Sequence, residues 1–255
     1  MRKAVTIAAA FGLSFVMITG CGKGENKHTY RDAGIEALNT GDYEGAVTAF
    51  DQAIEKSKGL VGAFDIDVLK YRAEAEYLLK DYQAAADTYS ALIQVDKELP
   101  EYYNLRCQAR ALTGDYTGAM EDYKRSAELD TDQNAPGRLQ ALLAAGSAME
   151  AQGAKDEAMA LYEAANSEGI QNAELFNRMG LCKFEEKDYD AAISYYSQGF
   201  TMEDASAVPE LMYNQAVAYE YKGEFTKARE LMEQYLSAAG NDKEAERELE
   251  FLKTR

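Results

Sequence analysis

The chain of 255 residues has no tryptophan, three prolines, three cysteines and one histidine, His28. A single histidine almost excludes a nucleophilic triad and histidine-based metal sites. Three prolines and abundant alanine favour an all-helical protein. No glycine-rich phosphate loop follows a strand, because no segment is convincing as a strand. We therefore expect a protein that is not an enzyme and needs no cofactor or metal.

Basic residues are also few. The chain has 27 Lys and Arg against 44 Asp and Glu, a formal net charge of −17. The first 20 residues contain Arg2, Lys3 and no acid, so the rest carries −19. This argues against nucleic acid as a partner. Two interpretations stay open: the acids keep the protein soluble, or they attract basic segments of partner proteins.

What the sequence does contain is an internal repeat. Six short turns recur at intervals of 39, 34, 39, 34 and 36 residues, a period typical of stacked helical hairpins. An alanine follows each turn by five residues and a large side chain follows it by nine. Small residues stand seven positions before each turn. The six turns lie at Gly41, Lys80, Gly114, Gly153, Lys187 and Gly223.

The spacing of the small and large residues predicts close helix packing. Positions four apart lie on one face of a helix. Two helices approach closely where side chains are small, and bulky neighbours fill the remaining space. The alanines are Ala46, Ala85, Ala119, Ala158, Ala192 and Ala228; the small residues before the turns are Gly34, Ala73, Cys107, Gly146, Gly180 and Ala216.

This pattern resembles the tetratricopeptide repeat (TPR) family over roughly residues 27–236. The turns Gly41-Asp42-Tyr43 and Gly114-Asp115-Tyr116, together with the alanine and small-residue columns, carry the resemblance. Three features depart from it: tryptophan is missing from the first helices, the end-of-repeat proline is mostly absent, and the fourth turn reads Gly153-Ala154-Lys155. We interpret the fourth copy as divergent rather than absent.

The resemblance implies an all-α fold, a right-handed superhelical solenoid of about six helical hairpins over residues 29–240. Residues 241–255 are expected to form a C-terminal capping helix, since Ala245, Leu249 and Leu252 follow helical spacing. Glycines in the turns should close one helix in the left-handed region, and the aspartate after them should cap the next. Lys80 and Lys187 in the glycine place should each cost about 1 kcal/mol if they are left-handed.

The first residues predict export and lipidation. Arg2 and Lys3 precede an apolar run that ends in Ile18-Thr19-Gly20-Cys21, and this order describes a signal peptide over residues 1–20. The cysteine after small residues resembles the lipobox of bacterial lipoproteins. That resemblance implies diacylglycerol (and palmitate-type acyl chains) on Cys21, a flexible tether over residues 21–28, and a place on the extracytoplasmic side of a bacterial cell membrane. The alternatives are an uncut membrane helix or a chance cysteine.

The other two cysteines predict neither a disulfide nor a metal site. Cys107 takes the place of a small residue before a turn, and Cys182 takes a place held by alanine in other repeats. Both are therefore expected to be buried thiols in the core.

In the family that the sequence resembles, the first helices of the repeats line a concave groove that touches a partner segment. Offsets from each turn give the candidate partner-binding residues, although packing between repeats explains each of them equally well. Two acids interleaved with the candidates, Glu185 and Glu220, would favour a partner with basic residues. The carboxylate clamp known in the family is not expected, because only Arg31 fits it. The candidates are Lys70, Tyr77, Asn104, Gln108, Asn177, Leu181, Phe184, Tyr213, Val217 and Tyr221.

We therefore interpret the chain as a lipid-anchored bacterial TPR scaffold that binds proteins or peptide segments at the cell envelope. The alternatives are an assembly factor of an envelope machine, such as outer-membrane or pilus biogenesis, and a binding protein for peptide or glycan ligands.

Overall fold

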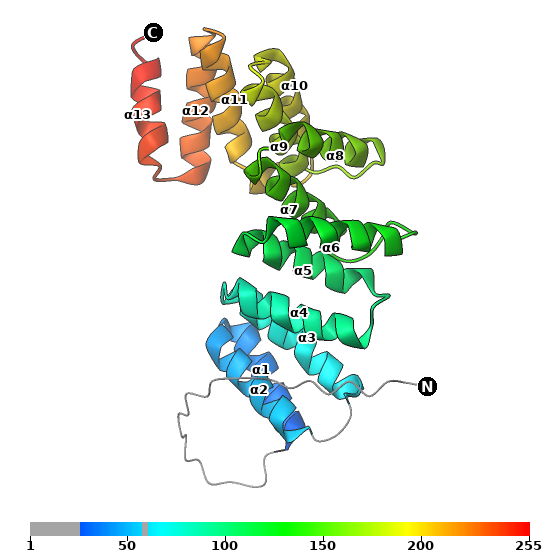
Figure 1. Ribbon diagram of the computed structural model, residues 1–255. Helices are drawn as coiled ribbons and strands as arrows, with labels where there is room; N and C mark the ends of the chain where they lie inside the picture. Colours follow the sequence, from blue (N-terminus) through cyan, green and yellow to red (C-terminus); the bar gives the residue numbers. More distant parts are fainter. Residues whose placement is uncertain (1–25, 58–60) are drawn as a thin grey trace. The chain divides into compact units, whose positions relative to one another are not determined.

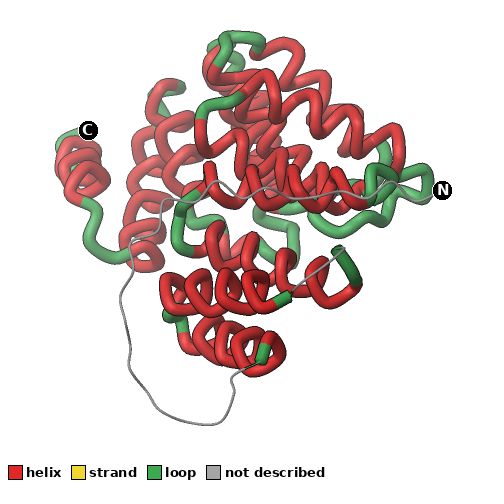
Figure 2. Tube along the Cα trace, turned by 60° about the horizontal axis from the view of Figure 1, so that its bottom comes forward, coloured by secondary structure: helices red, strands yellow, loops and turns green. Residues whose placement is uncertain are grey.

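The computed structural model describes residues 26–57 and 61–255. Its regular elements are all helices, and no strand occurs in these residues (Figures 1 and 2). The predicted all-α fold is confirmed. The predicted signal peptide, Cys21 and most of the predicted tether lie outside the described residues.

The chain forms two compact units. The first, residues 1–151, holds α1 (Lys27–Thr40), α2 (Tyr43–Lys56), α3 (Ala63–Leu78), α4 (Tyr82–Val95), α5 (Pro100–Thr113), α6 (Tyr116–Leu129) and α7 (Arg138–Ala151). The second, residues 152–255, holds α8 (Lys155–Ser167), α9 (Ala173–Glu185), α10 (Tyr189–Gly199), the 3₁₀ turn Ala205–Ala207, α11 (Glu210–Tyr221), α12 (Phe225–Ala239) and α13 (Lys243–Leu252). The division falls just before the divergent fourth turn, where Ala154 offers α8 no side-chain cap.

The turns have the expected chemistry. Gly41 and Gly114 are left-handed, with φ of 82° and 83°. Lys80 and Lys187 are left-handed too, with φ of 66° and 64°, so these two turns keep the geometry despite the steric cost. The aspartate after the turn caps the next helix by accepting a backbone N–H bond, at 3.0 Å from Gly45 to Asp42, 3.1 Å from Ala84 to Asp81, 3.0 Å from Gly118 to Asp115 and 3.1 Å from Ala191 to Asp188.

Small residues allow the paired helices to touch. All six alanines of the repeat are fully buried. A Cβ added at Gly34 would lie 2.5 Å from the Phe50 ring, and one added at Gly180 would lie 2.3 Å from the Tyr196 ring. The small residue before the turn thus faces the large residue nine positions after it, as the spacing predicts.

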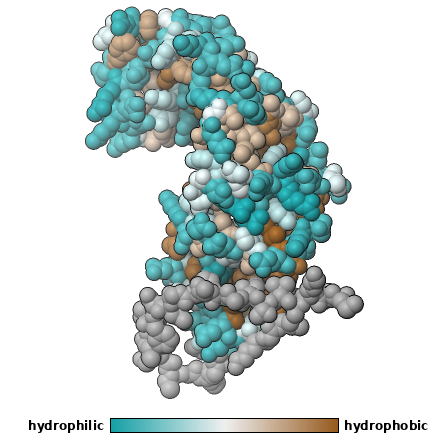
Figure 3. Space-filling model, in the orientation of Figure 1, coloured by the Kyte–Doolittle hydropathy of each residue, from teal (hydrophilic) through white to brown (hydrophobic). Residues whose placement is uncertain are grey.

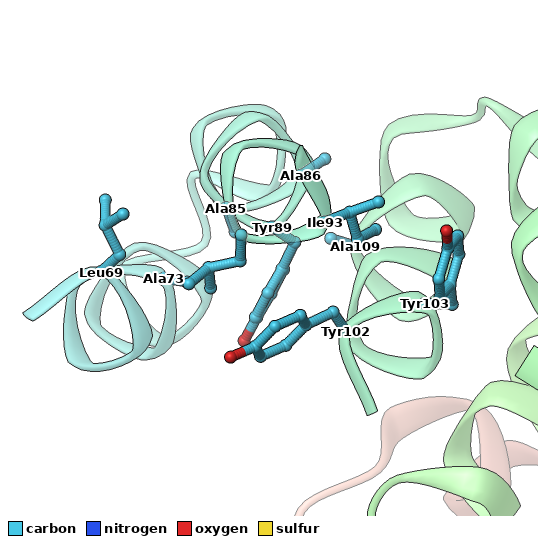
Figure 4. Close-up of a cluster of buried hydrophobic side chains, with 10 residues drawn as sticks. Leu69, Ala73, Ala85, Ala86, Tyr89, Ile93, Tyr102, Tyr103 and Ala109 are labelled. Carbon is cyan, nitrogen blue, oxygen red and sulfur yellow. The ribbon is translucent and has the colours of Figure 1, made fainter. Parts of the chain in front are cut away.

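Neighbouring hairpins stack through apolar side chains. In unit 1 a cluster joins α3, α4 and α5, with Leu69 and Ala73 on the first helix, Tyr89 on the second and Tyr102 on the third (Figure 4). In unit 2 the last helix covers the preceding hairpin: Ala245 and Leu252 are buried against α11 and α12. This is the packing expected of a capping helix.

A polar contact between hairpins was not predicted. The residue eight positions before a turn donates hydrogen bonds to the residue ten positions after the previous turn. This hydrogen bond joins the first helix of one hairpin to the second helix of the preceding hairpin. The contacts are Arg72 Nε to Asp51 Oδ1 at 2.7 Å, Arg106 Nη1 to Ser90 Oγ at 2.9 Å and Gln215 Nε2 to Ser197 Oγ at 2.8 Å.

The structure also places the one histidine and two of the cysteines. His28 belongs to α1, which begins at Lys27, because the Asn26 side chain caps the helix by accepting the His28 and Thr29 N–H groups. The His28 ring packs edge-on against Phe64 at 4.8 Å between centroids. Cys107 and Cys182 are both buried, as predicted, and burial raises the pKa of Cys107 to about 12.

Candidate functional site

One groove opens between α3 and α5 of unit 1, with a volume of about 460 Å³. Three of the predicted partner-binding residues line it together: Lys70, Tyr77 and Gln108. Helix α3 supplies Lys70 and Tyr77, which lie two turns apart, while α5 supplies Gln108. These side chains are exposed or half-buried, so the groove is open to a ligand.

Two tyrosines form the floor of this groove. Tyr89 reaches it from α4 and Tyr102 from α5, and Figure 4 shows their hydroxyl ends pointing the same way. Only 5% of Tyr89 and 4% of Tyr102 is exposed. The Tyr89 hydroxyl has no hydrogen-bonding partner among the described residues. Burial, and after it the charges of Glu74 and Glu101, raise the pKa of Tyr89, so its hydroxyl stays protonated.

The walls carry three acids and one base. Glu101 lies 3.7 Å from Lys70 Nζ, and Asp67 lies 3.4 Å from Arg31 Nη1. Glu74 is exposed and has no cationic partner among the described residues. The Lys70 ammonium also lies 5.3 Å from the centre of the Tyr102 ring. The groove therefore keeps a negative charge after its own cations are counted.

Both predicted asparagines are buried rather than open to the groove face. Asn104 is 1% exposed and donates to the carbonyl oxygen of Pro136 at 2.9 Å. Asn177 is 5% exposed and accepts from Asn214 Nδ2 at 2.8 Å. Their amides hold neighbouring segments together, because a buried amide needs hydrogen-bonding partners.

In unit 2, two predicted residues meet in an aromatic cluster. Phe184 of α9 and Tyr221 of α11 contact each other edge-on at 5.3 Å between ring centroids. Tyr189 at the start of α10 completes the cluster, 5.4 Å from Phe184 and 5.3 Å from Tyr221. Tyr221 is 63% exposed, the largest value among the exposed large hydrophobic residues described. Aromatic rings left in water in this way are typical of a binding surface.

The remaining predicted residues of unit 2 are half-buried. Tyr213 and Val217 pack on the apolar cluster that joins α11, α12 and α13, with the Tyr213 ring 5.3 Å from that of Tyr235. Leu181 lies on α9, one turn before Phe184. On the face drawn in Figure 3, hydrophobic residues lie among hydrophilic ones. What defines the aromatic cluster is that each of its three rings contacts the other two.

The two acids expected to attract basic partners in unit 2 are partly neutralised. Glu185 pairs with Lys155 at 2.5 Å. Burial, and then a hydrogen bond and repulsion from Glu248, raise the pKa of Glu220 to about 7. Glu220 therefore takes up a proton more readily than an ordinary glutamate and carries less negative charge near neutral pH. The stronger negative site of the two surfaces is the groove of unit 1.

Sequence reasoning missed several residues of both surfaces. Tyr89 was assigned to packing alone, since it occupies the large-residue position, yet its hydroxyl end reaches the groove. Tyr102 stands one position before the packing residue Tyr103, and Glu101 was not among the predicted partner-binding residues. Tyr189 immediately follows the capping aspartate of its turn, and an aromatic residue at that position is the sequence signal for a contact with Phe184.

The described residues show no metal site: no group of three or more His, Cys, Asp or Glu side chains is close enough to hold an ion. None of the described helices combines the length and apolar character needed to cross a bilayer. Each unit consists of helical hairpins that repeat along the chain, and this arrangement defines a helical-repeat protein.

The chain belongs to the tetratricopeptide repeat family. The family model matches residues 31–100 and 177–243, one stretch in each unit. Among curated proteins, the chain is similar to a member of the BBSome complex, BBS4 of Bos taurus, with 31% identity over 119 residues. That match covers 46% of this chain and only 22% of the relative.

Solved structures with the same fold include PilW, a type IV pilus biogenesis factor, and YrrB, a TPR protein with an unusual peptide-binding site. PilW is 15% identical with a TM-score of 0.68, covering 88% of this chain and 98% of its own. YrrB is 18% identical with a TM-score of 0.52, covering 78% of this chain and 97% of its own. At these identities the likeness concerns the fold alone.

Proposed function

We propose that the protein is a non-catalytic TPR scaffold that binds partner proteins or peptide segments at a bacterial cell envelope. The observation that carries the proposal is the cluster of Phe184, Tyr189 and Tyr221, whose outermost ring is 63% exposed. A few aromatic anchors supply most of the binding energy in many protein interfaces. A scaffold uses such anchors to hold partners in place, with no reactive group.

Similar proteins support this class of function. BBS4 is a member of a protein complex, and YrrB has a peptide-binding site. PilW, a pilus biogenesis factor, makes assembly of an envelope machine the second candidate function. A receptor for peptide or glycan ligands is the remaining alternative. It would show no defined protein neighbours and would respond to small molecules.

The partner surface is tested with Tyr221→Ala. We expect nearly unchanged thermal unfolding, because the side chain is mostly exposed, and a loss of partner affinity of about tenfold. Photo-crosslinkers placed at position 221 in intact cells first identify the partner, and binding of that partner to purified wild type and variant is then compared. Phe184→Ala in the same background should weaken binding further.

Leu112→Ala is the matched control, since Leu112 is a 52% exposed hydrophobic residue of unit 1, whereas the cluster belongs to unit 2. It should leave affinity unchanged. Crosslinks from position 221 that are no more defined than those from the exposed Glu121 would argue against the surface. A large fall in melting temperature for Tyr221→Ala would assign the ring to the core instead.

The envelope part of the proposal is carried by the residues Ile18-Thr19-Gly20-Cys21. Cleavage before Cys21 and acylation of its sulfur would anchor the protein, because two or three acyl chains give lasting membrane attachment. The lipid anchor would hold the scaffold on the extracytoplasmic side, with the residues between Cys21 and α1 as its tether.

Cys21→Ser is expected to move the protein from the membrane fraction to the soluble fraction. Mass spectrometry of the wild-type membrane fraction should detect an N-terminal peptide that begins at Cys21 and carries lipid. Cys182→Ala is the control: Cys182 is buried where other repeats have alanine, so anchoring should persist. An intact leader, or wild-type protein found fully in the soluble fraction, would contradict the anchor.

A further inference from the structure

We propose that the groove between α3 and α5 receives an arginine side chain of the partner polypeptide. This inference rests on the proposed function and specifies one subsite of it. The guanidinium would lie on the tyrosine floor, hydrogen-bonded to the Tyr89 hydroxyl, between the carboxylates of Glu74 and Glu101.

The first observation is the unused hydroxyl of Tyr89. The residue is 95% buried, as only 5% is exposed, and its phenol end lines the groove without a hydrogen-bonding partner among the described residues (Figure 4). Among the described residues, only the Tyr196 hydroxyl is both fully buried and without a partner, so water reaches the Tyr89 oxygen from the groove. A ligand that donates a hydrogen bond to this oxygen would take the place of that water. The oxygen accepts such a bond, and arginine offers five N–H donors.

The second observation is the charge of the walls. Glu74 has no cationic partner among the described residues, and Glu101 shares only the exposed Lys70 at 3.7 Å. A carboxylate on each side of a planar cation suits arginine, whose N–H groups spread over a fork. An acidic ligand would meet repulsion from Glu74, Glu101 and Asp67.

The third observation is that the chain already places a cation on the rim. Lys70 Nζ lies 5.3 Å from the centre of the Tyr102 ring and 3.7 Å from Glu101. An aromatic ring and a carboxylate are also the groups that would contact the guanidinium of the ligand. Lys70 is exposed, so it can yield its place. Lys70 is thus an internal competitor, and its removal should strengthen the binding of a cationic ligand.

The test measures the affinity of full-length protein for the peptide acetyl-(Arg)₄-amide by isothermal titration calorimetry. The neutral isostere acetyl-(citrulline)₄-amide should not bind. Tyr89→Phe should weaken binding about tenfold while the melting temperature stays constant or rises, because the lost hydroxyl had no partner. Glu74→Gln and Glu101→Gln should each weaken it about threefold, and Lys70→Met should strengthen it about threefold.

Glu121→Gln controls for net charge, since it removes one exposed acid of α6 outside the groove. If it weakens binding as much as Glu101→Gln, the attraction is unspecific and the subsite is refuted. If Lys70→Met weakens binding, Lys70 itself holds the ligand and the assignment is overturned. Equal binding of the citrulline peptide also overturns it.

The two proposals fail separately. In the first case, position 221 still gives defined crosslinks, but the groove variants bind the arginine peptide as well as wild type does. That result would overturn the arginine subsite and leave the scaffold proposal intact. In the second case, the groove variants change the affinity for the arginine peptide as expected, but position 221 gives no defined crosslinks. That result would overturn the scaffold surface and leave the arginine subsite standing.

Discussion

Asp122→Ala is expected to lower the stability of unit 1 by about 3–5 kcal/mol. Asp122 is 2% exposed, and its two carboxylate oxygens lie 2.6 and 2.8 Å from Arg106. Arg110 Nη1 donates to it as well, at 3.0 Å. Removal of the carboxylate leaves the charge of Arg106, a side chain only 14% exposed, without its compensating partner.

The loss should extend beyond one hairpin, because Arg106 also donates to Ser90 of the preceding hairpin at 2.9 Å. Chemical denaturation followed by far-UV circular dichroism measures the effect. Glu128→Ala is the control: Glu128 pairs with Arg125 at 3.2 Å on the exposed face of the same helix, where ion pairs contribute little. A loss below about 1 kcal/mol for Asp122→Ala would show that the arginines find other partners.

Gly180→Ala is expected to destabilise unit 2 by on the order of 1–3 kcal/mol, although alanine is the better helix former. The added Cβ would lie 2.3 Å from the Tyr196 ring. Tyr196 is fully buried, so its ring has no free space to move into. The sign of the stability change is informative, because a Gly→Ala substitution in an exposed helix would stabilise the protein by about 1 kcal/mol.

A smaller residue across the contact should relieve the clash. In the Tyr196→Leu background, Gly180→Ala should cost less than it does alone, and thermal unfolding of the four proteins forms a double-mutant cycle. Gly34→Ala is the equivalent change in unit 1, where the Cβ would meet Phe50 at 2.5 Å. Stabilisation by Gly180→Ala would show that the paired helices can separate without cost.

The local features of the repeat were predictable because each depends on residues close in the sequence. Gly41 ends one helix and Asp42 caps the next within a few residues. The small residue at 34 and the large one at 50 pack within one hairpin, so their spacing alone predicts the contact. Register with the glycines of the other repeats identified Lys80 as a turn position, but only the structure decided that Lys80 is left-handed.

The surfaces were only partly predictable, because helical spacing gives the face of a residue but not the reach of its side chain. Asn104 and Gln108 lie one turn apart on α5, yet the first is buried against Pro136 and the second lines the groove. Tyr221 was predicted as a contact residue from its offset. The contact of its ring with that of Tyr189 depends on how far α11 lies from the start of α10.

By itself, the sequence determined the repeat, the turns and the all-helical fold, because small and large residues at fixed spacing let each hairpin pack in one way. Only the tertiary structure decided which polar side-chain atoms form hydrogen bonds within the protein and which do not. It joined Arg106 to Ser90 across hairpins and left the Tyr89 hydroxyl at the floor of an acidic groove. The physical reason is that hydrogen bonds and charge compensation depend on distances between helices far apart in the chain, and these distances are fixed by packing rather than by local spacing.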